Sequence, residues 1–124
     1  MFYSKTFSNE KPLILKSDYV QVLTIQQIQL ITGTNKIKDD KQPIEIKLQH
    51  QNKEYTICTL YLNKLEIYDC NIVLRIGSST KEEYKLTAST KIKTNIKVII
   101  NGFIDFEEDI TGKRKSDYLT QILK

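Results

Sequence analysis

Apolar and polar residues alternate along most of the chain with the two-residue period of a half-buried β-strand. The clearest segment is 53–62, whose two faces would be formed by Tyr55, Ile57, Thr59 and Tyr61 and by Thr56, Cys58, Leu60 and Leu62. The segment 44–48 alternates in the same way, and the polar run 49–53 separates the two. Together they predict a β-hairpin.

Six further segments carry the same signal between polar turns, namely 1–7, 13–15, 19–30, 68–76, 82–88 and 96–104. Phe2 and Tyr3 are the expected core anchors of the first. In 19–30 the phase of alternation changes between Val22 and Leu23, which predicts a bulge or a bend. A helix over 23–30 is the alternative, but its β-branched residues favour a strand. Eight short strands predict an all-β fold, either a sandwich or a barrel.

Length and composition narrow the class of protein. The 124 residues suit one domain with a single core, and neither a membrane-spanning apolar run nor a signal-peptide pattern is present, so we expect a soluble intracellular protein. Cys58 and Cys70 have no metal-binding spacing, which favours buried free thiols. The net charge is +4, and residues 1–104 carry 15 basic and 10 acidic side chains. This balance permits phosphate or acidic partners but does not imply them, and a solvated surface is the favoured interpretation.

Four segments, taken in order, resemble the nucleoplasmin-like domain: 2–3 (FY), 23–30 (LTIQQIQL), 54–60 (EYTICTL) and 98–103 (VIINGF). The resemblance is closest to the domains that begin nuclear FKBP-type immunophilins and to plant histone-deacetylase-like nucleoplasmins. It covers roughly residues 1–104. One departure is Ser4, which stands where the family usually has Gly after the opening aromatic residue.

The resemblance implies an eight-stranded jelly-roll sandwich over residues 1–104, followed by a tail over 105–124. Such domains assemble as a homopentameric ring, or as a decamer of two rings, and chaperone core histone dimers or tetramers in the nucleus. It implies no enzyme activity, catalytic residue, cofactor, metal, membrane or small-molecule substrate. Whether a further domain follows, such as a prolyl isomerase, stays open.

The sparse acidic residues give the candidate histone sites. Asp105, Glu107, Glu108 and Asp109 form one cluster where the family's tail begins, and a solvated linker is the alternative interpretation. Asp39 and Asp40 are a secondary acidic loop, although three lysines surround them. Lys113, Arg114 and Lys115 are either a nuclear import signal or part of a soluble tail. The segment 116–124 has the pattern of a short helix.

Two other classes of function remain open. A nucleic-acid-binding β-barrel would use lysines for phosphates and aromatic residues for stacking, although no strand concentrates both. A purely structural oligomerisation module would use the same strands without histone affinity. Catalysis has little support, because the only histidine, His50, lies in a polar turn and the four glycines are isolated.

Overall fold

The computed structural model describes residues 1–16, 20–31, 41–77 and 83–106. These residues form eight strands: β1 (Phe2–Ser8), β2 (Leu13–Leu15), β3 (Gln21–Ile31), β4 (Ile44–His50), β5 (Lys53–Leu60), β6 (Ile67–Ile76), β7 (Tyr84–Thr90) and β8 (Lys97–Phe106). None of the described residues forms a helix that is long and apolar enough to cross a membrane.

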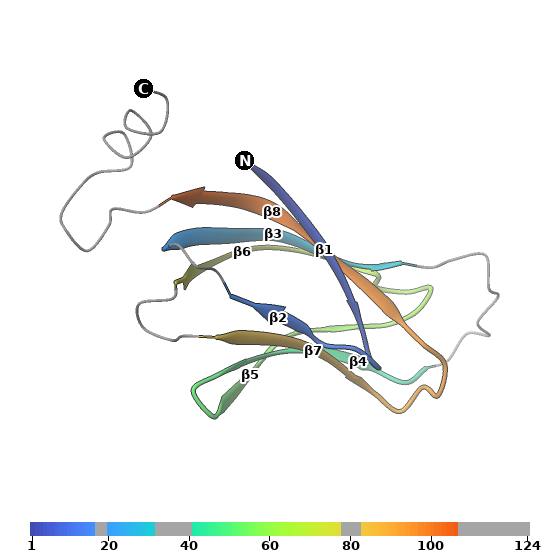
Figure 1. Cartoon of the computed structure of the whole chain (residues 1–124). Coiled ribbons are helices and arrows are strands. Elements are labelled where there is room, and N and C mark those ends of the chain that lie inside the picture. Colours follow the sequence, from blue (N-terminus) through green and yellow to red (C-terminus); the bar gives the residue numbers. More distant parts are fainter. Residues whose placement is uncertain (17–19, 32–40, 78–82, 107–124) are drawn as a thin grey trace, which may run out of the picture.

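The strands lie in two four-stranded antiparallel sheets that face each other (Figure 1). The first sheet has the order β1-β8-β3-β6, and the second has the order β2-β7-β4-β5. Apolar side chains from both inner faces fill the space between the sheets, and β3 and β4 contribute more of them than any other strand. The predicted all-β, eight-stranded sandwich is therefore confirmed. Phe2 is a correction, because it points to the outside and is exposed, whereas Tyr3 is half-buried against the core.

The long strand β3 contains a bulge, three residues later than predicted. Leu23 and Ile25 are buried, and after the extra residue Gln26 the buried positions shift to Ile28 and Leu30. The change of phase at Val22 has a different cause, since Val22 faces outward opposite Asp105 of β8. Strand rather than helix is confirmed for this segment.

Gly102 of β8 lies where β3 bulges and the two backbones approach most closely. A Cβ atom on Gly102 would stand 1.8 Å from the carbonyl oxygen of Thr24 and 3.1 Å from the Cα of Ile25. Only glycine can occupy this position without separating the strands.

The predicted hairpin is present, with a turn at Gln51 and Asn52. Both turn residues have positive φ, 50° and 64°, as the twist of a two-residue hairpin requires. The predicted faces of β5 are wrong over half of the strand, because the register shifts by one residue between Ile46 and Lys47 of β4. As a result Tyr55 lies opposite the buried Leu48, whereas Thr56 lies opposite Lys47 on the outer face.

The antiparallel order places the connections β1–β2, β5–β6 and β7–β8 at one end of the sandwich, where β3 also ends and β4 begins. The opposite end holds the β4–β5 hairpin, the N-terminus and the end of β8 (Figure 1). There the Ile104 N–H donates a hydrogen bond of 2.8 Å to the carbonyl of Met1. The two ends of the sandwich therefore carry different parts of the sequence.

Candidate functional site

The outer face of the first sheet carries an exposed apolar row. Phe2, Phe103, Thr24 and Val73 stand side by side across its four strands. Phe2 is 68% exposed, Phe103 44% and Val73 60%. The outer face of an antiparallel sheet is usually polar in a protein that stays monomeric, so this row is a candidate interaction surface.

A polar row lies directly beside the apolar one. Ser4, Asn101, Gln27 and Asp69 occupy the next positions on the same four strands. The Ser4 hydroxyl donates to the Asn101 side-chain oxygen at 2.9 Å, and the Gln27 amide donates to Asp69 at 3.2 Å. The apolar surface therefore has a polar margin, as the rim of a specific interface does.

A second apolar surface follows the open side of the sandwich between the edge strands β5 and β6, and we call it the β5–β6 edge. These strands belong to different sheets, so their side chains cover one another only in part. The edge consists of Tyr55, Ile57 and Cys58 of β5 and Tyr68, Cys70 and Ile72 of β6. Tyr55 is 52% exposed, and Ile57 and Ile72 are half-buried against the core. It lies on the opposite side of the first sheet from Phe2.

Both cysteines lie on this edge. They are free thiols, as predicted, but each is half-buried rather than fully buried. The Cys70 thiol donates to the carbonyl of Ile25 at 3.4 Å, beside the β3 bulge. Burial raises the pKa of Cys58 to about 11, with a smaller contribution from the neighbouring Cys70 thiolate. Burial also raises the pKa of Cys70. Burial therefore favours the protonated form of both thiols, which is the less reactive form.

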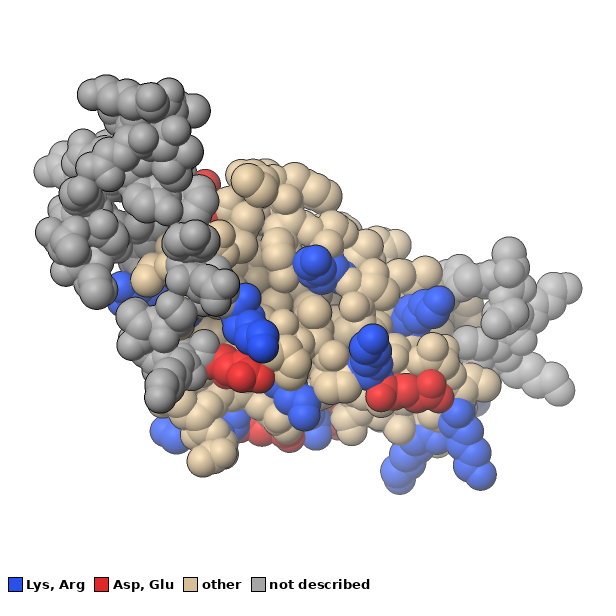
Figure 2. Space-filling model, in the orientation of Figure 1, with Lys and Arg blue, Asp and Glu red and all other residues tan. Residues whose placement is uncertain are grey.

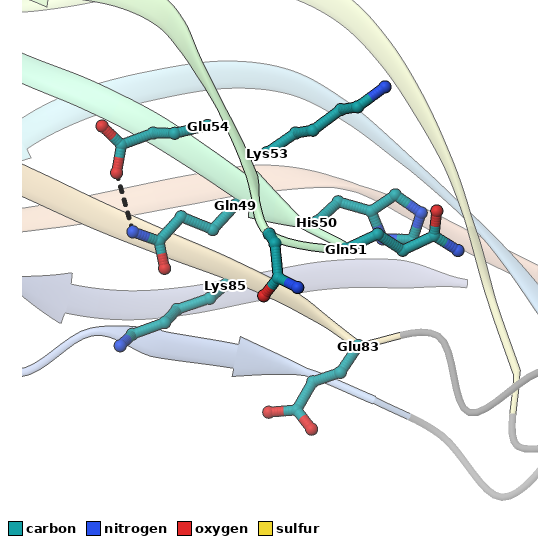
Figure 3. A pocket seen from close by; sticks show the side chains of 8 residues that line it. Gln49, His50, Gln51, Lys53, Glu54, Glu83 and Lys85 are labelled. Atoms are coloured by element: carbon teal, nitrogen blue, oxygen red, sulfur yellow. Dashed lines mark hydrogen bonds between the residues drawn. The ribbon is translucent and has the colours of Figure 1, made fainter.

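An open cavity of about 530 Å³ lies at the tip of the β4–β5 hairpin, next to His50 (Figure 3). The His50 ring is half-buried and stacks on Tyr84 with 4.2 Å between centroids, and its Nδ1 has no hydrogen-bond partner among the described groups. The nearby Glu54 carboxylate accepts from Gln49 at 2.7 Å, and this bond, together with the neighbouring Lys47, lowers the pKa of Glu54. The His50 ring, stacked on Tyr84, thus helps to hold the β4–β5 hairpin against β7.

Among the described residues, no group of three or more His, Cys, Asp or Glu side chains could hold a metal ion. Of the predicted acidic cluster, the structure describes Asp105, which lies exposed within β8 opposite Val22. The other predicted site residues lie outside the described ranges; they are Glu107, Glu108, Asp109, Asp39, Asp40, Lys113, Arg114 and Lys115. Their arrangement around Asp105 stays a prediction.

Comparisons with known proteins now add to this geometry. No family model and no curated protein matches the sequence. The structure is similar to the crystal structure of the Drosophila NLP core, with a TM-score of 0.61 and 17% sequence identity over 83% of this chain and 96% of the other. The chain has a nucleoplasmin-like fold. The Drosophila structure was reported for its insight into pentamer formation and histone binding.

The nucleoplasmin-like resemblance is thereby confirmed at the level of the fold. Two residues of the segment 98–103 now have a structural explanation. Gly102 permits the close approach of β3 and β8, and Phe103 stands in the exposed apolar row. The sequence did not reveal this row, because its members come from four strands and meet only in the folded sheet.

Proposed function

We propose that this chain is a nuclear histone chaperone core, which assembles head to tail into a homopentameric ring and binds core histones. The nucleoplasmin-like fold carries the proposal, since the Drosophila protein with this fold was described in terms of pentamers and histone binding. The sequence resemblance extends the proposal to the group that includes nuclear FKBP-type immunophilins and plant histone-deacetylase-like nucleoplasmins.

Two separate apolar surfaces support the assembly. A closed ring requires a heterologous contact, in which one surface of each copy meets a different surface of the next. Phe2 and Phe103 lie at the β1 side of the first sheet, and the β5–β6 edge lies at its other side. We assign these two surfaces to the two halves of the contact. The side chains of Phe2 and Phe103 together expose roughly 200 Å² of aromatic surface, enough to anchor a larger interface between subunits.

The histone contact requires carboxylates, and the described body offers few of them. It carries 12 basic and 7 acidic side chains, so its surface is positive. We therefore assign histone binding to Asp105, Glu107, Glu108 and Asp109, with Asp39 and Asp40 as a secondary acidic loop. A ring would repeat the cluster in every subunit, and multivalency would strengthen a contact that is weak in one copy. Lys113, Arg114 and Lys115 are assigned to nuclear import.

Sedimentation and native mass spectrometry test the ring. The parent chain is expected near five times the 14.5 kDa mass of one chain at micromolar concentration. The double variant Phe2→Ser/Phe103→Ser should dissociate, because it removes the aromatic anchors from an exposed surface without opening the core. Ile14→Ser is the matched control, since Ile14 is an exposed apolar residue of the second sheet. A monomeric parent contradicts the ring.

Histone binding is measured on the same proteins. Replacing Asp105, Glu107, Glu108 and Asp109 with Asn or Gln should weaken binding of core histones in a salt-dependent way and leave the native mass unchanged. Asp39→Asn/Asp40→Asn is the comparison variant. If the first variant binds as tightly as the parent and the second loses binding, the histone site lies in the loop instead.

A further inference from the structure

Six lysines converge on one end of the sandwich, and we call this surface the lysine end. They lie in the β1–β2, β5–β6 and β7–β8 connections, in the residues that precede β4 and at the first position of β8, and they are Lys11, Lys41, Lys64, Lys91, Lys93 and Lys97. All six are exposed. Figure 2 shows basic side chains projecting at the lower right of the molecule, where β7 and β8 are joined in Figure 1.

The lysine end holds nearly all of the positive excess of the described body. Its only described carboxylates are Glu10 and Glu66, and Glu66 already accepts the backbone N–H of Asn63 at 3.1 Å. The rest of the described body is almost balanced, with six basic and five acidic side chains. Within the described ranges, none of the six lysines forms an ion pair, whereas Lys47 on β4 pairs with two carboxylates.

Protection of sheet edges does not explain this arrangement. Lysines that block edge-to-edge pairing lie along the edge strands, which are β1, β6, β2 and β5 here. The six lysines instead lie in connections or at the first position of a central strand. A charged surface built by connections from both sheets is typical of a binding surface.

The connections that carry these lysines are held together by hydrogen bonds. The Asn9 side chain donates to the Thr94 carbonyl at 3.0 Å and accepts from the Ile96 N–H at 2.7 Å. The Ser8 hydroxyl accepts from the N–H of Lys11 at 3.0 Å. The backbones that bear Lys11, Lys93 and Lys97 are therefore fixed relative to one another before a partner arrives, which reduces the entropy lost on binding.

We infer that the lysine end binds duplex DNA through its phosphates, independently of sequence. The end of a two-sheet sandwich is roughly 15 Å wide and 10 Å deep, so its lysines fall within about two Debye lengths of one another. Duplex DNA carries one charge per 1.7 Å of its axis and is attracted by such a cluster through counterion release. Lysine suits this role, since it contacts phosphate as a point charge and reads no base pattern. The site needs neither the ring nor the histone contact.

The test is fluorescence anisotropy of a labelled 20-base-pair duplex with the full chain, from 50 to 200 mM salt. The lysine-end variant replaces Lys11, Lys91, Lys93 and Lys97 with Gln. A control variant with the same change in charge replaces Lys5, Lys16, Lys53 and Lys85, which lie outside the lysine end. Unchanged native mass and histone binding in both variants separate this test from that of the proposed function.

We expect the parent to bind, with a plot of log affinity against log salt that falls with a slope near −4 to −5. The lysine-end variant should bind at least 100-fold more weakly at 50 mM salt, with a slope reduced by about 3.6, since each lost phosphate contact removes about 0.9. The control should change less than threefold. Three results would overturn the inference: no binding by the parent at 50 mM salt, equal losses in both variants, or binding of poly-glutamate as tight as that of DNA.

Discussion

Replacing Gly102 with alanine tests whether the contact between β3 and β8 is as close as the structure shows. The new Cβ would lie 1.8 Å from the Thr24 carbonyl oxygen, whereas non-bonded heavy atoms are stable at about 3.5–4 Å. The strands would therefore have to separate by about 1.5–2 Å. Such a shift breaks neighbouring hydrogen bonds between two central strands, because N–H···O bonds weaken steeply beyond about 3.2 Å.

The expected loss is about 3–6 kcal/mol, from overpacking that costs about 1–3 kcal/mol and from two or three weakened backbone hydrogen bonds at about 1 kcal/mol each. This is a large part of a typical unfolding free energy of about 5–15 kcal/mol. Urea unfolding followed by circular dichroism measures it. Gly77→Ala is the comparison variant, since its Cβ would lie 3.0 Å from Cγ2 and 3.2 Å from Cα of Val20, which is a tight contact without the overlap found at Gly102. A loss below about 1 kcal/mol for Gly102→Ala, or equal losses in both variants, would refute the reasoning.

Two further predictions concern Cys58 and Asn9. The pKa of Cys58 is about 11, against 9.0 for an ordinary thiol, so the folded protein holds much less of the reactive thiolate at pH 8. Iodoacetamide should therefore modify Cys58 roughly 100-fold more slowly in the folded Cys70→Ser variant than in the same variant unfolded in urea. Mass spectrometry measures the two rates. Because the folded thiol keeps its proton to higher pH, its contribution to the free energy of unfolding is complete below pH 9 and is lost between about pH 9 and 11. Equal alkylation rates in the folded and unfolded protein would contradict the raised pKa of Cys58. Asn9→Ala should lower the free energy of unfolding by about 1–3 kcal/mol, because the partly buried Ile96 N–H loses its acceptor. Urea unfolding measures this loss, and a change below about 0.5 kcal/mol would argue against that hydrogen bond.

The eight strands could be predicted because the period of alternation is a local property of the sequence. Leu86 and Ala88, or Val98 and Ile100, show their inward face within a few residues. The bulges could not be placed, because a bulge is defined by the partner strand. The change of phase at Val22 predicted a bulge or bend there, yet Val22 stands on the outer face, whereas Gln26 gave no signal that it is the extra residue.

The surfaces were less predictable than the strands, because they join residues that are distant in the sequence. Phe2 and Phe103 are paired across β1 and β8, and Phe2 appeared to be a core anchor until its outward register was known. The lysine end is built from positions between 11 and 97, and a window of sequence shows only Lys91, Lys93 and Lys97 together. Only the antiparallel topology, which brings alternate connections to the same end, makes the charge visible.

The strand β8 connects the two charged regions that the proposals assign to different partners. It begins at Lys97, in the lysine end, and reaches Asp105 eight residues later. An extended strand of that length separates the two side chains by about 27 Å, several times the Debye length of about 8 Å at physiological ionic strength. Opposite charges at that distance do not neutralise each other. One subunit therefore has room to present lysines to DNA at one end and Asp105 to histones at the other, and because the interaction between these charges is screened, loss of the contact at Asp105 should leave the DNA contact intact.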